Sequence, residues 1–173
     1  VEVKVLSATG KSLFKQIQSI TSPADTLIHF EKLLKNVQPW SAESPYLYTL
    51  VINTTDRNGR VEESVAQPFG FRTIEMKNGQ LLVNGVAITI KGVNRQEHNA
   101  VHGRTLSIGE MVKDVKMMKQ FNINAVRTSH YPNYSEWYQL CDKYGLYMVG
   151  EANIECHGIL DTEYKQLADR EDW

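Results

Sequence analysis

The first 72 residues have the hydrophobic pattern of short β-strands. The valines among residues 1–5 alternate with charged residues, which is the two-residue period of a half-buried strand. Apolar runs at residues 27–30 and 47–52 predict two further strands, and residues 56–65 predict a turn and a returning strand. Several short strands separated by turns favour a β-sandwich, of which this segment would be only a part.

A different pattern begins after residue 72. Asn-Gly pairs at residues 78–79 and 84–85 predict two tight turns, and residues 86–93 read as the strand that follows them. After that strand, the spacing of the apolar residues changes from the two-residue period of a strand to the period of a helix. This change marks a second domain, which we expect to occupy residues 73–173.

Two amphipathic helices are predicted in this second part. Ser107 and Glu110 form a capping-box pattern, and the apolar residues that follow predict a helix over residues 108–120. Asn133 is the predicted cap of a second helix, whose apolar side includes an aromatic stripe typical of a core. Gly145 stands where a glycine commonly ends a helix.

Compact apolar runs at residues 124–127 and 146–149 complete a strand–helix–strand–helix–strand order. This order is typical of a parallel sheet with right-handed crossovers. It suits either a doubly wound sheet or a (β/α)8 barrel, and no glycine-rich phosphate fingerprint follows any strand, which disfavours a dinucleotide-binding sheet. A complete barrel needs roughly 250 residues. A barrel domain would therefore be represented here by its first three strands.

The composition excludes several classes of function. With 42% hydrophobic and 23% charged residues, the chain has the make-up of a globular protein, and its net charge of −1 gives no reason to expect nucleic acid or an anionic membrane as partner. No apolar run approaches the roughly 20 residues of a membrane helix. The two cysteines, Cys141 and Cys156, are too few for a disulfide framework and match no zinc motif.

Three polar clusters follow the predicted parallel strands, at residues 94–98, 127–133 and 151–158. In parallel α/β folds the chemistry gathers at the carboxyl ends of the strands. Because each cluster combines arginine, histidine or carboxylate side chains at such an end, the three together predict one shared site.

Single residues in these clusters allow more than one interpretation. Glu155 and His157 would point to the same side of an extended backbone and could share a divalent cation, although spacing alone favours a solvated pair. Arg127 could form a salt bridge at the sheet rim, or it could hold a catalytic carboxylate ionised and aimed. His130 could donate to a substrate hydroxyl, or it could cap or pack.

The clusters resemble successive signatures of family 2 glycoside hydrolases. The matching runs are residues 92–98, 124–133 and 151–158, and residues 40–48 and 69–72 resemble the domain before the barrel and its junction. The Asn-Ile-Glu-x-His-Gly run is the β-galactosidase form, whereas Ser-His-Tyr-Pro is shared with β-glucuronidases and β-mannosidases. The resemblance covers the chain from about residue 36 to residue 158.

The resemblance implies an immunoglobulin-like β-sandwich over residues 1–72, followed by the first three βα units of a (β/α)8 TIM barrel. It implies a longer parent enzyme that hydrolyses terminal non-reducing β-D-galactosyl residues by a retaining mechanism with two glutamates. In this family the acid/base glutamate follows an asparagine, and the chain has no Asn-Glu pair. We therefore expect an internal segment that lacks both catalytic glutamates and is inactive alone.

Alternatives to a β-galactosidase remain. The parent could be a β-glucuronidase or β-mannosidase of the same family, or a non-catalytic module that binds carbohydrate or a protein partner. The family resemblance further implies a β-galactoside oligosaccharide or glycoside as substrate and a homo-oligomeric full-length enzyme. The segment carries no targeting signal, which leaves a bacterial cytoplasm or periplasm open.

The resemblance also assigns site residues. Glu155 and His157 correspond to ligands of an active-site Mg²⁺, which Mn²⁺ could replace, and the ligands of a possible Na⁺ are not identifiable in this segment. Arg127 corresponds to the supporting arginine near the nucleophile, and His130 to the histidine that contacts the galactosyl group in the transition state.

Two residues of the first cluster are implied to bind substrate, namely Asn94 and Gln96. Gln96 departs from the family, because the best-known bacterial enzymes have histidine at this place. An amide can still donate a hydrogen bond to a hydroxyl, but it cannot carry charge. The detailed substrate preference is therefore the property that this substitution would change.

Overall fold

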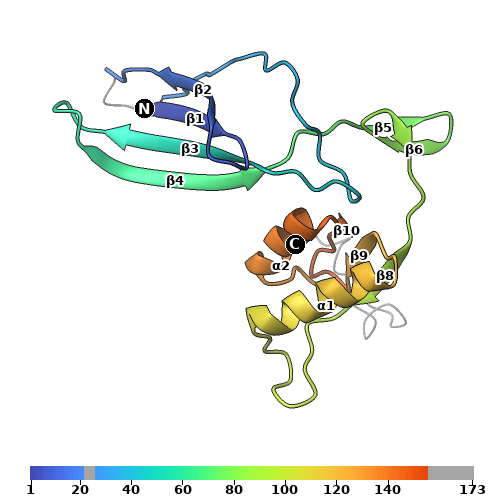
Figure 1. Ribbon diagram of the computed structural model, residues 1–173. Coiled ribbons are helices and arrows are strands. Elements are labelled where there is room, and N and C mark those ends of the chain that lie inside the picture. The colour runs from blue at the N-terminus through green and yellow to red at the C-terminus, as the bar shows by residue number, and fades with distance from the viewer. Residues whose placement is uncertain (22–25, 156–173) are drawn as a thin grey trace, which may run out of the picture. The chain divides into compact units, whose positions relative to one another are not determined.

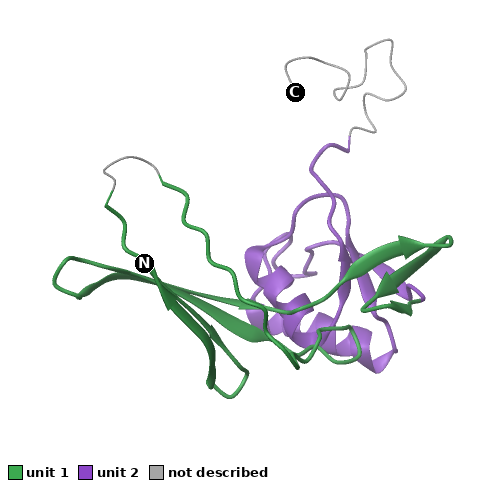
Figure 2. Ribbon diagram, turned by 90° about the horizontal axis from the view of Figure 1, so that it is seen from above, with its two compact units in different colours: residues 1–88 green, residues 89–173 purple. Residues whose placement is uncertain are grey.

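The computed structural model describes residues 1–21 and 26–155. The chain forms two compact units, residues 1–88 and residues 89–173 (Figure 2). Within the described ranges, no helix combines the length and the apolar character needed to cross a membrane.

The first unit contains a four-stranded antiparallel sheet in the order β2-β1-β3-β4 (Figure 1). Its strands are β1 (Glu2–Leu6), β2 (Ser12–Ile17), β3 (Tyr48–Thr55) and β4 (Val61–Phe69). The strands predicted at the N-terminus, at residues 47–52 and in the returning arm of the hairpin are confirmed. Up to residue 72, the described part of the chain supplies this one sheet, so the two layers of an immunoglobulin-like sandwich stay a prediction.

The strand predicted at residues 27–30 is wrong. These residues form no strand, and Leu27 is fully exposed. The edge position next to β1 is taken instead by β2, which the sequence pattern did not reveal, and the carbonyl of His29 accepts a hydrogen bond from the Gln18 side chain. An apolar run becomes a strand only when a neighbouring strand is available for its backbone.

The C-terminal end of β4 packs closely on an aromatic side chain. Trp40 is buried, and its amide donates to the carbonyl of Phe71. A Cβ atom added to Gly70 would lie 2.5 Å from the Cβ of Trp40, so only glycine allows this approach. The nearby ring of Tyr48 packs on Phe71 with a centroid distance of 5.0 Å.

A small antiparallel sheet follows, in the order β5 (Ile74–Lys77), β6 (Gln80–Val83) and β7 (Val86–Ala87). Its two turns lie at the predicted Asn-Gly pairs, where both residues of each pair have positive φ. Asn84 Nδ2 donates to the carbonyl of Trp40, which ties this sheet to the first unit. The compact units divide after Ile88, and the domain boundary expected after residue 72 stays a prediction.

The strand predicted over residues 86–93 is in fact two strands. β7 ends at Ala87 in the antiparallel sheet, and β8 (Gly92–Arg95) begins the parallel one. Between them, the Asn124 side chain accepts from the amide of Lys91 and donates to the carbonyl of Thr89. Because a distant side chain satisfies these backbone groups, the chain leaves one sheet and enters the next without continuing as a strand.

The second unit has the predicted alternation of strands and helices. β8 is followed by α1 (Ile108–Gln120), β9 (Ala125–Thr128), α2 (Ser135–Tyr144) and β10 (Tyr147–Val149). The three strands are parallel in the order β10-β9-β8 (Figure 1). Antiparallel sheets thus precede parallel βα units, as expected for a domain ahead of the start of a barrel.

The predicted capping box of α1 is confirmed. The amide of Glu110 donates to Ser107 Oγ at 3.3 Å, and the amide of Ser107 donates to the Glu110 carboxylate at 2.8 Å. The hydrogen bond from the Ser107 backbone, helped by the Ser107 side chain, lowers the pKa of the Glu110 carboxyl. The box therefore sets the helix start through contacts only three residues apart.

The predicted cap of α2 is wrong at its N-terminus and confirmed at its C-terminus. Tyr134 precedes the first helical residue and makes no side-chain cap. Asn133 is buried, and its side-chain oxygen instead accepts from Arg95 at 2.8 Å. A hydrogen bond from a buried guanidinium is stronger than one from a neutral backbone amide at a helix cap, so the Asn133 side chain binds Arg95. Gly145 ends the helix in the left-handed conformation, as predicted.

The core of the second unit lies between the two helices and the sheet. Val126 and Leu146 come from the sheet side. The predicted apolar faces of the helices supply the rest of the buried cluster: Met111, Val115, Met118, Trp137, Leu140 and Cys141. Burial raises the pKa of the Cys141 thiol to about 12, so this cysteine is a packing residue and not a nucleophile.

Loss of the capping box should weaken α1 measurably. We expect Ser107→Ala to lower the free energy of unfolding by about 1 kcal/mol, because an orphan amide of the first turn loses its acceptor. Ser12→Ala, in the exposed strand β2, is the matched control. The difference should shrink as the pH falls through the lowered pKa of Glu110, because the carboxylate half of the box is then protonated. Chemical denaturation at two pH values measures the free energy of unfolding of each variant. An equal loss of stability in Ser107→Ala and Ser12→Ala would contradict the prediction.

The Cys141 thiol should be unreactive in the folded protein. In a Cys156→Ser background, an aromatic disulfide reagent should modify Cys141 only after denaturant is added. Because the thiol ionises near pH 9 when unfolded and near 12 when folded, stability should be complete below pH 9 and fall as the pH rises between these values. Rapid modification of the native protein at pH 8 would show that the thiol is not buried.

Candidate active site

The carboxyl ends of the three parallel strands meet at one edge of the sheet. Pairing sets Arg127 of β9 beside Asn94 of β8 on one side and Val149 of β10 on the other. The polar clusters predicted to share a site follow directly from these positions. The architecture therefore brings together side chains from loops more than twenty residues apart.

Arg127 is held by partners from both neighbouring strands. Its Nη2 atom donates to Glu151 Oε1 at 3.0 Å and lies 2.8 Å from Oε2, and its Nη1 atom donates to Asn94 Oδ1 at 3.4 Å. Its side chain is 38% exposed. The guanidinium is therefore oriented by the protein while part of it stays open to solvent at the mouth of the site.

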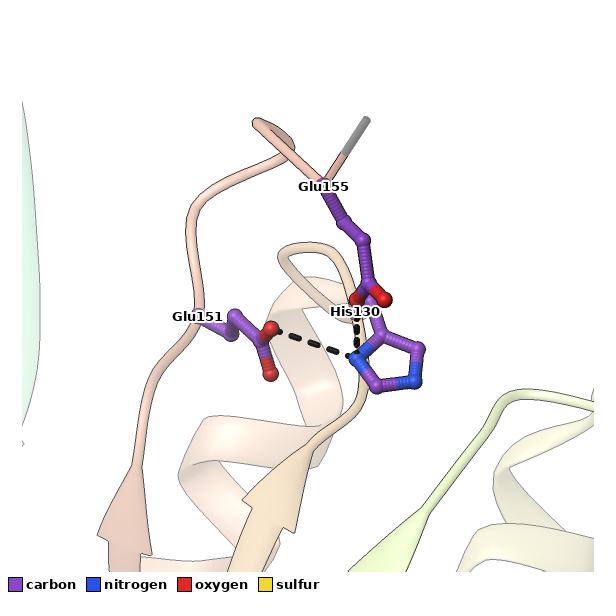
Figure 3. Close-up of side chains that lie close together, drawn as sticks. All are labelled: His130, Glu151 and Glu155. Carbon is purple, nitrogen blue, oxygen red and sulfur yellow. Dashed lines mark hydrogen bonds and ion pairs between the residues drawn. The ribbon is translucent and has the colours of Figure 1, made fainter. Parts of the chain in front are cut away.

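His130 lies between two carboxylates (Figure 3). Its Nδ1 atom is 3.2 Å from Glu151 Oε1 and also contacts the carboxylate of Glu155. One ring nitrogen from the β9 loop thus meets acidic groups from the segment after β10. Figure 3 shows the second ring nitrogen on the side of the imidazole away from both carboxylates.

The ligand atoms of His130, Glu151 and Glu155 all lie within 4.8 Å of one another. A single proton on Nδ1 cannot form two equally good hydrogen bonds to the carboxylates of Glu151 and Glu155. A divalent cation could be coordinated by the imidazole and both carboxylates at once. Two carboxylates and one imidazole suit Mg²⁺ or Mn²⁺ through oxygen and also tolerate a softer ion. The donor set therefore fits a divalent cation, and it shares Glu155 with the ligand pair that the family resemblance implied.

Most of the predicted site residues in the described ranges converge. Arg127, His130 and Glu155 meet in one group, and Asn94 reaches it through Arg127. Gln96 lines a cavity between β8 and α1, as Asn94 also does, but no hydrogen bond between described residues joins Gln96 to Arg127. The predicted ligand His157 lies outside the described residues.

Glu151, the first residue of the third predicted cluster, joins the loops at the centre of the site. It pairs with Arg127 and His130 and so links the loops after β9 and β10. Its amide donates to Thr128 Oγ1 at 3.0 Å, which fixes the start of its loop. The signal available in the sequence was its position immediately after the apolar run of β10, at the carboxyl end of a strand.

Two family profiles cover this chain. Residues 1–72 match the one described as "Glycosyl hydrolases family 2", and residues 74–173 match "Glycosyl hydrolases family 2, TIM barrel domain". The second match includes all of the parallel sheet and the loops that form the candidate site.

Individual relatives agree with this assignment. The chain is 55% identical over 126 residues to a β-galactosidase of Alteromonas mediterranea, a match over 73% of the chain and 12% of that protein. It is 49% identical over 140 residues to a β-galactosidase of Streptococcus thermophilus, over 81% of the chain and 13% of that protein. It therefore spans about an eighth of the length of these relatives.

Among solved structures, the fold is similar to a β-glucuronidase from Ruminococcus gnavus in complex with D-glucaro 1,5-lactone. The TM-score is 0.76 at 29% sequence identity, over 87% of this chain and 24% of that one. Since a family profile covers more than half of the chain, the chain belongs to family 2 of the glycosyl hydrolases.

Proposed function

We propose that this chain is the front of the catalytic barrel of a β-galactosidase, together with part of the domain before it. The whole enzyme would release terminal non-reducing β-D-galactosyl residues with retention of configuration. The observation that carries the proposal is the meeting of Arg127, His130, Glu151 and Glu155 at the carboxyl end of the parallel sheet. That edge is where enzymes with a TIM barrel keep their active sites.

The relatives favour a galactoside over other sugars. Eight relatives called β-galactosidase, from 42% to 56% identical, align with this chain, whereas the similar β-glucuronidase structure is 29% identical. A β-glucuronidase or β-mannosidase is the second candidate, because the β9 cluster is common to these enzymes. A non-catalytic carbohydrate-binding module is disfavoured, because binding alone does not require an oriented, partly exposed arginine–carboxylate pair beside a histidine.

The retaining reaction needs an acid/base and a nucleophile roughly 5 Å apart. We infer that both glutamates come from later strands of the barrel, since the chain has no Asn-Glu pair. Glu151 has its charge committed to Arg127, so it suits neither role. The guanidinium of Arg127 would hold the nucleophile carboxylate ionised and aimed.

His130 would contact the galactosyl group through its outward nitrogen. The carboxylates on its Nδ1 side fix the plane of the ring and leave Nε2 for a hydroxyl of the sugar. Asn94 would help to orient Arg127 and would bind substrate beside it. Gln96 would offer an amide where other enzymes of the family have an imidazole.

Mg²⁺ is the proposed cofactor, held by Glu155 and His157. When bound, it would supply a fixed positive charge beside the acid/base glutamate. The carboxylate of Glu155 already points into the three-residue group, which suits this role.

The full-length protein should hydrolyse nitrophenyl β-D-galactoside far faster than the matching β-D-glucuronide or β-D-mannoside. Arg127→Met should lower kcat/KM roughly a hundredfold or more, because a preorganised charge is lost from the site. Arg57→Met, in an exposed turn of the first unit, is the control and should leave kcat/KM unchanged. Preference for the glucuronide or mannoside would transfer the proposal to the second candidate.

The isolated 173-residue chain should not hydrolyse the same galactoside. It carries the supporting residues without the acid/base and the nucleophile, so positioning alone cannot break the bond. Purified chain and full-length protein would be assayed at equal concentration. Turnover by the isolated chain at a rate comparable with the full-length protein would place the catalytic pair within these residues and end the proposal.

Glu155→Gln should weaken Mg²⁺ binding to the full-length protein at least about tenfold, because a charged ligand oxygen is replaced by a neutral one. Isothermal titration of the metal-free protein with MgCl2 measures the affinity. Glu43→Gln, at an exposed site in the first unit, serves as the control. Equal affinity in both variants would remove Glu155 from the metal site.

A further inference from the structure

A second arginine lies beneath the site, in the interior of the unit. Arg95, the last residue of β8, has a side chain only 4% exposed. Its guanidinium carbon lies 3.6 Å from the centre of the Trp137 ring of α2, and its Nε atom donates to Asp114 of α1 at 3.0 Å. Both helices therefore hold the guanidinium in place, independently of its contacts with the loops.

The free edge of Arg95 faces the loop between β9 and α2. Its Nη1 atom donates to Asn133 Oδ1 at 2.8 Å, and Asn133 Nδ2 donates to the carbonyl of Tyr131 at 3.2 Å. The backbone carbonyl of Arg95 also accepts from the amide of Ser129 at 3.0 Å. One residue of β8 thus contacts this loop at two separate points.

Glu97 adds two further contacts. Its carboxylate accepts from the amide of Tyr134 at 3.1 Å, and its own amide donates to the hydroxyl of Tyr131 at 3.1 Å. The same carboxylate lies 3.6 Å from Arg95 Nη1, so opposite charges hold the two residues together. Residues two apart on an extended strand share a side, which leaves Gln96 between them out of this network.

These contacts surround His130 along the chain. The loop is held at residues 129, 131, 133 and 134, before and after the histidine. The side chain of His130 makes its polar contacts with Arg127, Glu151 and Glu155 of the candidate active site. Buried charged groups hold geometry tightly, because every loss of a partner leaves a desolvated charge. Such a network restricts where the imidazole can lie.

We propose that Arg95, Glu97, Tyr131 and Asn133 form a clamp that positions His130 against the galactosyl group. These residues act through His130 and do not touch the substrate. The inference rests on the proposed function for its effect on catalysis, although the clamp itself is a property of the fold. A displacement of about 1 Å at a contact of this kind can cost roughly a hundredfold in rate.

The test is a double-mutant cycle in the full-length protein. Asn133→Ala should lower kcat/KM for nitrophenyl β-galactoside about ten- to a hundredfold, with kcat falling more than KM rises. In a His130→Ala background the same change should have almost no effect, because its target is absent. An equal loss in both backgrounds would show a general structural role and overturn the clamp.

Two further variants keep the result decisive. Tyr131→Phe removes only the hydroxyl that accepts from Glu97, so it should show the same coupling on a smaller scale if Asn133→Ala fails to fold. Asn124→Ala is the matched control, because it removes an asparagine that holds two backbone groups at the opposite end of the same sheet. It should lower the melting temperature with no coupling to His130.

Hydrogen exchange separates this proposal from the proposed function. The amides of Ser129 and Tyr134 should exchange about tenfold faster in Asn133→Ala than in wild type, and Asn124→Ala should leave them unchanged. If wild type does not hydrolyse the galactoside but exchange accelerates as expected, the function is wrong and the clamp stands. If wild type is active and exchange is unchanged, the clamp is wrong.

Discussion

The parallel pairing of three short strands is the constraint on which the rest depends. Because β8, β9 and β10 run in the same direction with helical crossovers, their carboxyl ends share one edge, and each contributes a polar loop there. Antiparallel pairing would have sent alternate loops to opposite ends of the sheet, and no common site could have formed.

The two arginines of this region are held for different tasks. Arg127 is half-exposed and faces Glu151 at the mouth, whereas Arg95 is nearly buried and faces Asn133, Asp114 and the Trp137 ring. Exposure decides the difference. A partly solvated guanidinium can exchange one partner for a substrate or catalytic carboxylate, but a buried one cannot leave its partners without a large desolvation cost.

The comparisons separate fold from specificity in a similar way. A β-glucuronidase shares the backbone of this chain with a TM-score of 0.76, while the relatives with higher sequence identity are β-galactosidases. One architecture is therefore shared by relatives that are named for different sugars.

Features that depend on contacts between neighbouring residues could be predicted from the sequence alone. The capping box at Ser107, the Asn-Gly turns, Gly145 and the strand–helix alternation involve residues a few positions apart, so their outcome was predictable. Three other features depend on contacts between residues far apart in the chain. Asn133 binds an arginine 38 residues away and does not cap its helix, and the break after Ala87 depends on the side chain of Asn124. Glu151 lies between Arg127 and His130 only because the strands are paired in parallel. A backbone or side-chain polar group takes its strongest available partner, and only the folded chain determines which partners lie within reach.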